Sequence, residues 1–282
     1  MSIRSNHNSQ WHFDRQCLDP SHRIDGISAF MRLRNEEEFV EQAILSHLPF
    51  FDEIVAVYNR CTDRTPEILA RLEKLHPEKI KVFEYEPHVY PQGSKEHATL
   101  PSGSPHSIVN YSNYALSKTT RTVVTKLDGD HIAVIETLAS AVEKIRHEGL
   151  QCYLTYHGIN LTRDIFGNIA VLKERPLCGG FDIGFFPVSQ NTYFMHDPRF
   201  EVFKNNLPHL NLGVLFFHAK FLKKCRGFSN YDLCDNPDSR YHEQEKWLHS
   251  HRSTIPYTQY LQQQNLDHFE LPEFLRQYGN VP

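Results

Sequence analysis

The chain has 282 residues, of which 40% are hydrophobic and 12% aromatic, so it can bury a sizeable core and is not a disordered chain. Its 30 basic and 34 acidic side chains give a formal net charge of −4 without a strongly basic block, which excludes a dedicated duplex-DNA binder. No apolar run approaches the roughly 20 residues that a membrane-spanning helix needs.

The cysteine spacing and the N-terminal residues indicate the cellular compartment of the protein. The six cysteines form no CxxC pair, and residues 1–15 lack the apolar stretch of a secretory signal. We therefore expect free thiols in a cytoplasmic protein. Residues 213–217 are apolar and lysines follow them, so a peripheral contact with the inner face of the membrane stands as an alternative to a buried strand there.

The first half of the chain alternates strand-like and helix-like segments. Residues 26–33 form an apolar, strand-like run, after which Asn35 stands at the N-cap position of a predicted helix. Residues 53–59 are β-branched and predict a second strand. In the helix that follows, Thr65 is the expected N-cap and Pro66 the first helical residue.

The alternation continues to residue 130. Residues 79–87 predict a third strand, the Pro- and Gly-rich residues 88–106 a long loop, and residues 107–119 a helix. A fourth strand, residues 121–128, runs directly into Asp128-Gly129-Asp130. The pattern predicts an α/β fold with a mostly parallel sheet flanked by helices, in which ligands bind at the carboxyl ends of the strands.

The second half is less regular. Residues 134–149 predict a helix closed by Gly149, and residues 152–161 predict a strand. Residues 162–212 mix short apolar pieces with Gly, Pro and Asn, and the Gly-rich residues 178–182 look like a mobile turn on the acceptor side. Residues 239–251 have helical spacing. We expect the whole chain, residues 1–282, to be a single domain.

Asp128-Gly129-Asp130 is the sharpest chemical feature. Two carboxylates one small residue apart, at the end of a buried strand, offer hard oxygen ligands to Mg²⁺ or Mn²⁺, which bridge carboxylates to substrate phosphates. The small Gly129 would let a pyrophosphate approach the backbone. A simple turn is the alternative, but the place after the fourth strand favours a metal site.

Two other strand ends carry polar side chains. Asn59 can donate and accept hydrogen bonds, which suits the edge of a nucleobase. Asp63 could accept from a ribose hydroxyl or cap the following helix, and both interpretations stay open. Arg32 could hold a phosphate with two hydrogen bonds, or it could be a surface arginine beside an acidic run.

Together these features resemble the family 2 glycosyltransferases and the wider set that shares the GT-A fold. The residues that carry the resemblance are Asn35-Glu36-Glu37, Tyr58 to Asp63, Tyr111-Ser112-Asn113 and Asp128-Gly129-Asp130, in consistent order over residues 26–132. The resemblance implies a nucleotide-sugar-binding half at residues 26–132 and an acceptor-side half at residues 133–282.

The resemblance also implies roles for individual residues. It places Asp128 and Asp130 at a divalent ion, with His218 as a third contact, although a buried core histidine is the alternative for His218. It places Glu243 or Glu245 as the base that takes the acceptor proton, with a solvated helix carboxylate as the alternative. The residues implied near the donor are Arg32, Asn35, Glu36, Asn59, Asp63, Asn113 and Asp128.

The sequence departs from the family pattern at positions that affect which donor nucleotide is expected. Tyr58-Asn59 stands where the family has two aspartates, and Asn59 could serve uracil, cytosine or guanine. The expected function is metal-dependent transfer of a sugar from a nucleotide-sugar to a hydroxyl of a glycan or lipid-linked glycan, in surface polysaccharide or glycoconjugate synthesis. A nucleotidyltransferase and a non-catalytic nucleotide- or sugar-binding module are the alternatives, and the former lacks its usual Gly-rich loop after the first strand.

Overall fold

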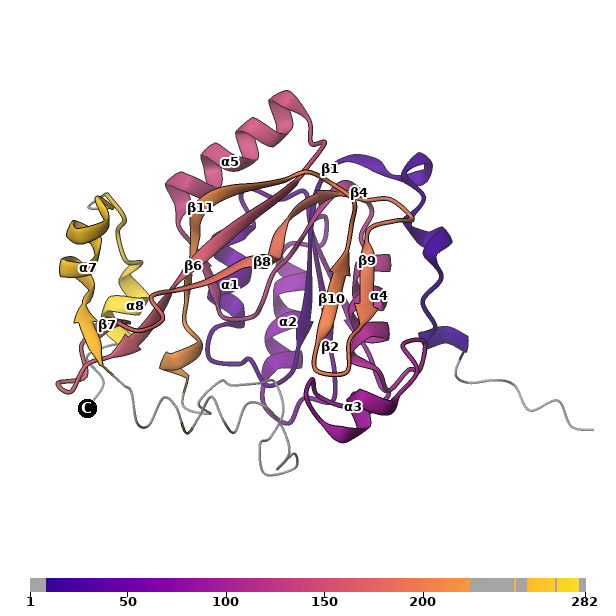
Figure 1. Cartoon of the computed structure of the whole chain (residues 1–282), viewed down its shortest axis with the longest axis horizontal. Coiled ribbons are helices and arrows are strands. Elements are labelled where there is room, and N and C mark those ends of the chain that lie inside the picture. Colours follow the sequence, from indigo (N-terminus) through magenta and orange to yellow (C-terminus); the bar gives the residue numbers. More distant parts are fainter. Residues whose placement is uncertain (1–8, 224–245, 247–252, 267, 279–282) are drawn as a thin grey trace, which may run out of the picture.

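The structure, a computed structural model, describes residues 9–223, 246, 253–266 and 268–278. A ten-stranded mixed sheet forms the centre of this part of the chain, with helices on both of its faces (Figure 1). The strand order along the sheet is β12-β7-β6-β8-β4-β1-β2-β3, and β11 and β5 are added beside β6.

The first half builds the parallel side of the sheet. Its strands are β1 (Ile24–Leu33), β2 (Glu53–Tyr58), β3 (Ile80–Glu84) and β4 (Arg121–Lys126). Its helices are α1 (Val40–His47), α2 (Thr65–Leu75), α3 (Lys95–Thr99) and α4 (Ile108–Ser117), and short 3₁₀ helices lie at Ser9–Trp11, Arg15–Leu18 and Pro20–His22. β1 pairs in parallel with β2 and β4, and β2 pairs in parallel with β3. The predicted α/β class with a parallel, helix-flanked sheet is thus confirmed.

The second half extends the sheet with strands of both directions. Its elements are β5 (His131–Ala133), α5 (Ile135–Glu148), β6 (Tyr153–Arg163), β7 (Ile169–Leu172), β8 (Leu177–Pro187), β9 (Tyr193–His196), β10 (Glu201–Lys204), β11 (His209–His218), a 3₁₀ helix η4 (Lys220–Leu222), β12 (Thr254–Pro256), α7 (Tyr257–Gln264) and α8 (Glu273–Tyr278). β9 and β10 form a separate two-stranded hairpin. β11 pairs in parallel with β6 and antiparallel with β5.

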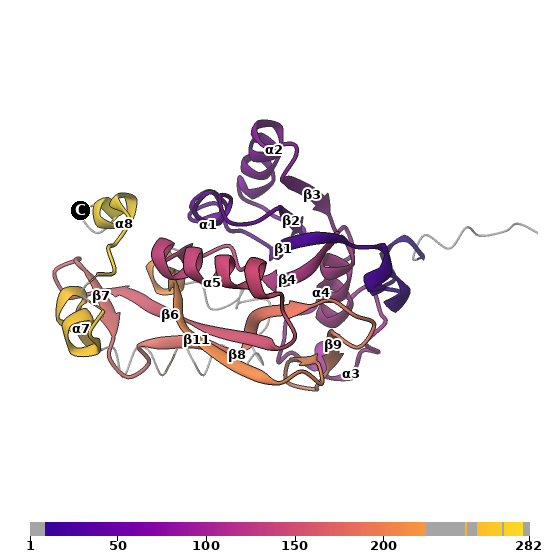
Figure 2. The same cartoon turned by 90° about the horizontal axis from the view of Figure 1, so that it is seen from above.

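Two hydrophobic clusters hold the helices to the sheet. In β1 the alternate residues Ala29, Met31 and Leu33 join the cluster that contains the buried side chains of α1, α2 and α5. Phe30 points to the other face, into the cluster formed with α4 and the β9–β10 hairpin. Figure 2 shows α1, α2 and α5 on one side of the parallel strands and α4 on the other.

Three local predictions were wrong. Asn35 does not cap a helix, because its φ is 56° and α1 begins only at Val40. The predicted loop at residues 88–106 contains the short helix α3, which Ser94 caps by accepting a hydrogen bond from the His97 amide. The Gly-rich residues 178–182 are not a turn but lie inside β8, where a Cβ on Gly180 would stand 2.3 Å from the His157 ring.

Other expectations can be compared directly. None of the helices in the described part of the chain has the length and hydrophobicity of a transmembrane span. The cysteines within this part, Cys17, Cys61, Cys152 and Cys178, are free thiols as expected. The predicted helix at residues 239–251 lies outside the described residues apart from Lys246, as do residues 224–238.

A charged candidate site at the strand ends

The loops after β1 and β2 are tied together by side chains that the sequence singled out. Asn35 Oδ1 accepts a hydrogen bond from the Thr62 amide at 2.8 Å. Asp63 accepts from the amides of Glu37 and Thr65, each at 3.0 Å, so it joins the two loops and also supports the start of α2. Asn35 and Asp63 therefore shape this edge of the sheet through backbone contacts.

Thr65 has a different role from the predicted one. Its hydroxyl accepts a hydrogen bond from the Glu36 amide at 2.7 Å, while Arg64 stands at the N-cap position of α2. The backbone of Glu36 is therefore fixed by the first residue of α2. This contact holds the Glu36 carboxylate, which is only 3% exposed, beneath the carboxyl ends of the strands.

Asn59 lies fully buried directly after β2. Its Nδ2 donates to the carbonyl oxygens of Tyr85, at 2.5 Å, and Pro87, at 2.7 Å. These two acceptors fix the orientation of the amide and use both of its N–H groups. Asn59 Oδ1 is buried and has no hydrogen-bond partner among the residues that the structure describes. An unpaired buried acceptor costs about 1–3 kcal/mol, so this oxygen is available to a donor from water or from a ligand.

Arg32, predicted to contact phosphate, is held by the β9–β10 hairpin. Its guanidinium donates to Ser112 Oγ at 2.7 Å and forms an ion pair with Glu201 Oε1, also at 2.7 Å. Ser112 Oγ in turn donates to the second carboxylate oxygen of Glu201. The side chains of Arg32 and Glu201 are 11% and 6% exposed, so this is a buried ion pair between β1 and β10.

Asn113, predicted to lie near the donor, binds the same hairpin. Its Nδ2 donates to the Phe194 carbonyl at 2.9 Å, and its Oδ1 accepts from the Phe194 amide at 2.8 Å. Both ends of the buried amide are therefore committed to the backbone of β9. The residues Ser112 and Asn113 of the predicted motif dock the hairpin onto α4.

This docking role predicts the result of replacing Asn113 by alanine. The buried backbone groups of Phe194 would lose their partners, which we expect to lower the free energy of unfolding by about 1–3 kcal/mol. Urea denaturation measures this loss, and calorimetry with a nucleoside diphosphate should give an unchanged affinity. Loss of nucleotide affinity without loss of stability would instead restore the predicted donor role of Asn113.

The Asp128-Gly129-Asp130 turn lies between β4 and β5, at the carboxyl edge of the parallel strands. The Asp128 side chain is 36% exposed, and its Oδ2 lies 3.9 Å from Lys126 Nζ and 3.6 Å from His131 Nε2. Burial tends to raise the pKa of Asp128, but the neighbouring charges, with Lys126 foremost, hold it below its usual value. Asp128 is thus an ionised carboxylate that solvent can reach.

Gly129 is needed for a reason other than the predicted one. A Cβ at this position would stand 2.9 Å from Glu36 Cγ and 2.9 Å from Leu33 Cδ2. The small residue therefore lets Glu36 and the turn pack against each other. The space beside Gly129 is filled by protein side chains, so a pyrophosphate does not explain this glycine.

Asp130 is buried and lies among cations. Its Oδ2 is 2.7 Å from Lys223 Nζ, and its Oδ1 is 3.5 Å from His218 Nε2. Burial alone would raise the pKa of Asp130, but Lys223 and His218 hold it well below its usual range. Lys223 Nζ also lies 2.5 Å from Glu36 Oε2. Burial still raises the pKa of Glu36 to about 7, against the lowering by Lys223.

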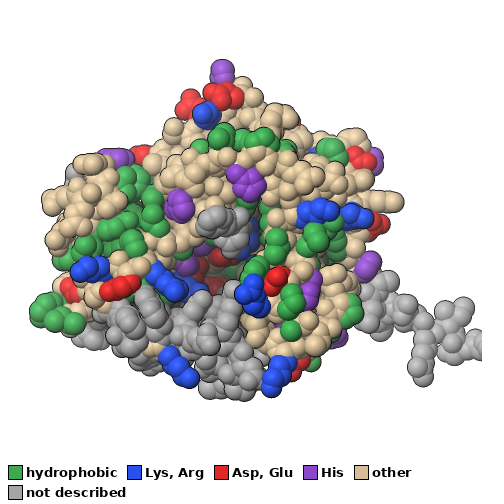
Figure 3. Space-filling view, in the orientation of Figure 1, with side chains coloured by type: hydrophobic (Ala, Val, Ile, Leu, Met, Phe, Trp, Pro, Cys, Tyr) green, Lys and Arg blue, Asp and Glu red, His purple; other side chains and the backbone are tan. Residues whose placement is uncertain are grey.

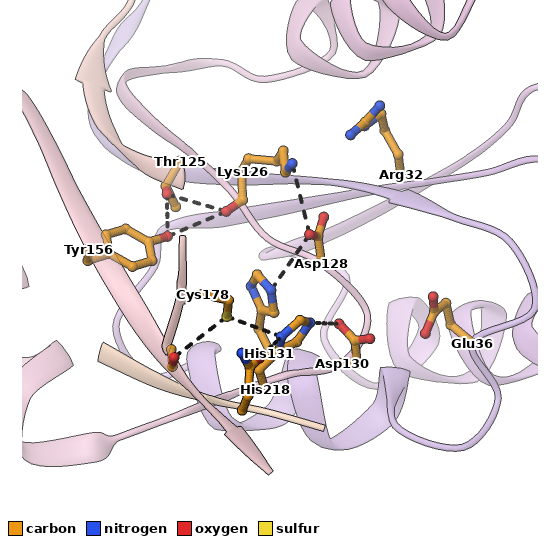
Figure 4. Close-up of polar contacts among 12 residues, drawn as sticks. Arg32, Glu36, Thr125, Lys126, Asp128, Asp130, His131, Tyr156, Cys178 and His218 are labelled. Carbon is orange, nitrogen blue, oxygen red and sulfur yellow. Dashed lines mark hydrogen bonds and ion pairs between the residues drawn. The ribbon is translucent and has the colours of Figure 1, made fainter. Parts of the chain in front are cut away.

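The imidazole ring of His218, at the end of β11, is oriented by contacts of its Nδ1 atom. Its Nδ1 lies 2.8 Å from Asn160 Oδ1 and 3.1 Å from Cys178 Sγ. Asn160 Nδ2 donates to the Arg175 carbonyl, so Oδ1 must be the atom that faces the imidazole, and His218 Nδ1 must carry a proton. His218 Nε2 is therefore directed at Asp130, as Figure 4 shows.

His131 completes the cluster. It pairs with His218 across β5 and β11, its ring stacks on Phe216 with centroids 3.9 Å apart, and burial lowers its pKa to about 3. His131 is therefore a neutral imidazole, the form that binds metals. Asp130, His131 and His218 each offer one ligand atom, and these atoms lie within 4.8 Å of one another. Burial lowers the pKa of His218, but Cys178 and Asp130 raise it to about 10, so His218 must release its Nε2 proton for this donor set to hold a divalent ion.

The structure brings together part of the predicted site. Asp128, Asp130, His218 and Glu36 meet at one edge of the sheet, whereas Asn113 and Arg32 bind the hairpin. His131, Lys223 and Glu201 were missed. His131 follows Asp130 directly in the chain, which is the one available signal. The predicted bases Glu243 and Glu245 lie outside the described residues.

The molecular face in Figure 3 is hollowed near its middle, with acidic side chains in the hollow and basic side chains beside it. Figure 4 shows Asp128, Asp130, Glu36 and Arg32 gathered at the same edge of the sheet. A cation and an anionic ligand could therefore be bound next to each other here.

The chain is similar to one protein family and to several solved structures. The family model described as β-1,4-N-acetylgalactosaminyltransferase (CgtA) matches residues 1–153 of the chain. No curated protein matches.

Solved structures give distant similarities. S. aureus TarS 1–349 has 21% identity and a TM-score of 0.31, and the match covers 50% of this chain and 36% of that one. A complex of the same TarS fragment with UDP gives 20% identity and the same TM-score and coverage. Glucosyl-3-phosphoglycerate synthase from Mycobacterium tuberculosis, in complex with Mn²⁺, UDP and glucosyl-3-phosphoglycerate, has 16% identity and a TM-score of 0.35 over 76% of this chain and 77% of that one. The chain thus spans little more than a third of the TarS fragment.

Proposed function

The chain belongs to the β-1,4-N-acetylgalactosaminyltransferase (CgtA) family of glycosyltransferases, and we propose that it transfers a sugar from a nucleotide-sugar to an acceptor hydroxyl. The family match over residues 1–153 is the observation that carries this proposal. It favours sugar transfer over the nucleotidyltransferase alternative. By the family description, N-acetylgalactosamine is the first sugar to test.

The environment of Asn59 supports a choice among nucleotides. Both N–H groups of its amide are used by the carbonyls of Tyr85 and Pro87, and only Oδ1 is left to pair with a base. Uracil and guanine present a ring N–H to such an acceptor, whereas the corresponding nitrogen of cytosine is itself an acceptor. We therefore propose a uridine or guanosine diphosphate donor, because cytosine could reach Oδ1 only through its exocyclic amino group.

This choice predicts a specific order of affinities. UDP should raise the melting temperature, and UDP methylated at N3 should bind about tenfold or more weakly, because the methyl group leaves Asn59 Oδ1 unpaired. CDP, which offers only its exocyclic amino group, should also bind more weakly than UDP. A thermal-shift titration of UDP, GDP, CDP and N3-methyl-UDP measures the order. Equal affinity for UDP and N3-methyl-UDP would contradict the role of Asn59.

A divalent ion at the Asp128–Asp130 turn is the second part of the proposal. Asp130, His131 and His218 would hold the ion, with Asp128 as the solvent-accessible carboxylate beside them. Two imidazole ligands favour Mn²⁺ over Mg²⁺. When bound, the ion would stabilise the charge of the departing nucleoside diphosphate. Asn160 keeps His218 Nε2 directed at Asp130, which prepares this nitrogen for the ion.

The acceptor side of the proposal concerns stereochemistry. A β-linked product from an α-linked sugar nucleotide requires inversion, and a single displacement needs a carboxylate to take the acceptor proton. Glu243 and Glu245 are our proposed candidates for this base. We propose a glycan or lipid-linked glycan as the acceptor, in surface polysaccharide or glycoconjugate synthesis at the cytoplasmic face of the membrane.

A transfer assay tests the activity. The protein is incubated with Mn²⁺ and UDP-N-acetylgalactosamine, with and without glycan acceptors, and released UDP and glycan products are quantified. We expect slow UDP release without an acceptor and faster release with one. Nucleotide binding without any release from several nucleotide-sugars would favour the non-catalytic binding module instead.

A further inference from the structure

Lys223 stands between two buried carboxylates of the candidate site. It directly follows η4, its side chain is 4% exposed, and its Nζ lies 2.5 Å from Glu36 Oε2 and 2.7 Å from Asp130 Oδ2. The two carboxylates come from the loop after β1 and from the turn between β4 and β5. Lys223 thus connects three segments that are distant in the sequence.

The ammonium group of Lys223 binds the same Asp130 carboxylate that would hold a divalent ion. Both oxygens of Asp130 already face a nitrogen, Lys223 Nζ at 2.7 Å and His218 Nε2 at 3.5 Å. An ion bound by Asp130 and His218 would put a second positive charge close to the ammonium in a buried setting, where like charges repel strongly. Lysine and metal therefore compete for the negative charge of Asp130.

Glu36 gives the displaced lysine a second partner. Its carboxylate is 3% exposed and makes the shorter of the two contacts with Lys223. The Glu36 backbone is fixed by Thr65, and its side chain packs against Gly129. If Lys223 left Asp130, its charge would still be paired with Glu36.

We propose that Lys223 is a resident counter-cation that competes with the divalent ion for Asp130, and that metal binding moves its ammonium onto Glu36 alone. The inference rests on the proposed metal site. It assigns Lys223 the role of neutralising Asp130 while the metal is absent. It also makes the affinity for the metal lower than the ligands alone would give.

The test compares Mn²⁺ binding to the full chain and to two variants, without nucleotide, by calorimetry and by electron paramagnetic resonance of free Mn²⁺. Lys223→Met should bind Mn²⁺ at least tenfold more tightly than the wild type, and Mn²⁺ should raise its melting temperature by more. Glu36→Gln should bind Mn²⁺ more weakly, because the displaced ammonium loses its remaining carboxylate. Lys220→Met, three residues earlier, is the matched control and should bind as the wild type does.

The outcomes separate this inference from the proposed function. Equal or weaker Mn²⁺ binding by Lys223→Met would overturn it, and if that variant does not fold, unchanged binding by Glu36→Gln would do so. Binding by Lys223→Met alone, with none by the wild type, would support it most strongly. Binding by neither would overturn both the inference and the metal site. The expected order of affinities without transfer from any nucleotide-sugar would overturn only the proposed activity.

Discussion

Replacing Asp130 by alanine is expected to lower the free energy of unfolding by about 3–5 kcal/mol, whereas the same change at Asp128 should remove activity with little effect on stability. Asp130 is buried, and its loss would leave Lys223 with one partner and His218 without its carboxylate. Asp128 is 36% exposed and its nearest cation, Lys126 Nζ, is 3.9 Å away, so its contribution to folding should be below about 1 kcal/mol.

The pair of variants separates folding from catalysis. Urea denaturation gives the two stabilities, and the transfer assay should show Asp128→Ala reduced by about 100-fold or more if Asp128 stabilises the reacting centre. Asp130→Asn, which keeps the shape of the side chain, is the control for packing. Equal stability of the two alanine variants would contradict the arrangement of charges around Asp130.

The second large effect is the contribution of His47 to the pH dependence of stability in mild acid. Burial lowers the pKa of His47 in α1 to about 4, whereas the unfolded chain titrates near 6.5. Between these values the unfolded state binds a proton that the folded state does not, so stability should fall as the pH drops from 6.5 to 4. The slope from His47 is up to about 1.4 kcal/mol per pH unit, or about 3 kcal/mol in all. His131, with its pKa of about 3, acts in the same direction, whereas Glu36, with its pKa raised to about 7, acts in the opposite direction. The comparison with a His47 variant therefore isolates the contribution of His47.

Unfolding curves at pH 7, 6 and 5 measure this slope. His47→Leu removes the proton and keeps the buried volume, so its stability should depend less steeply on pH than that of the wild type. His147→Leu, at an exposed position of α5, is the matched control and should leave the slope unchanged. The same slope in His47→Leu and the wild type would show that another group causes the acid sensitivity.

The sequence predicts the first half of the fold well because its strands and helices alternate with clear periodicity. β1, β2 and β4 each read as an apolar run, and α4 and α5 begin and end within a few residues of the predicted positions. The region of residues 162–212 could not be assigned, because its strands are short or, like β8, pair with the distant β4 and include glycines such as Gly180. The place of β11 beside both β5 and β6 depends on such distant pairing.

The site residues also differ in whether a local sequence pattern marks them or only a contact with a distant part of the chain places them in the site. Asp128 and Asp130 could be found because two carboxylates at a strand end are a local pattern. Lys223 could not, because its contact with Glu36 joins residues 187 positions apart and nothing in the neighbouring sequence marks it. Asn113 was assigned to the donor because a motif does not show which partner an amide will bind.

The pairing of β11 with β5 has a consequence for protein engineering. Phe216, Phe217 and His218 pair with Ala133, Ile132 and His131, the residues that directly follow the acidic turn. A fragment that stops near residue 153, where the family match ends, would lack this strand and also β8, the antiparallel neighbour of β4. Chimeras that exchange donor halves between relatives at residue 133 would have to carry β8 and β11 along to keep the acidic turn in place.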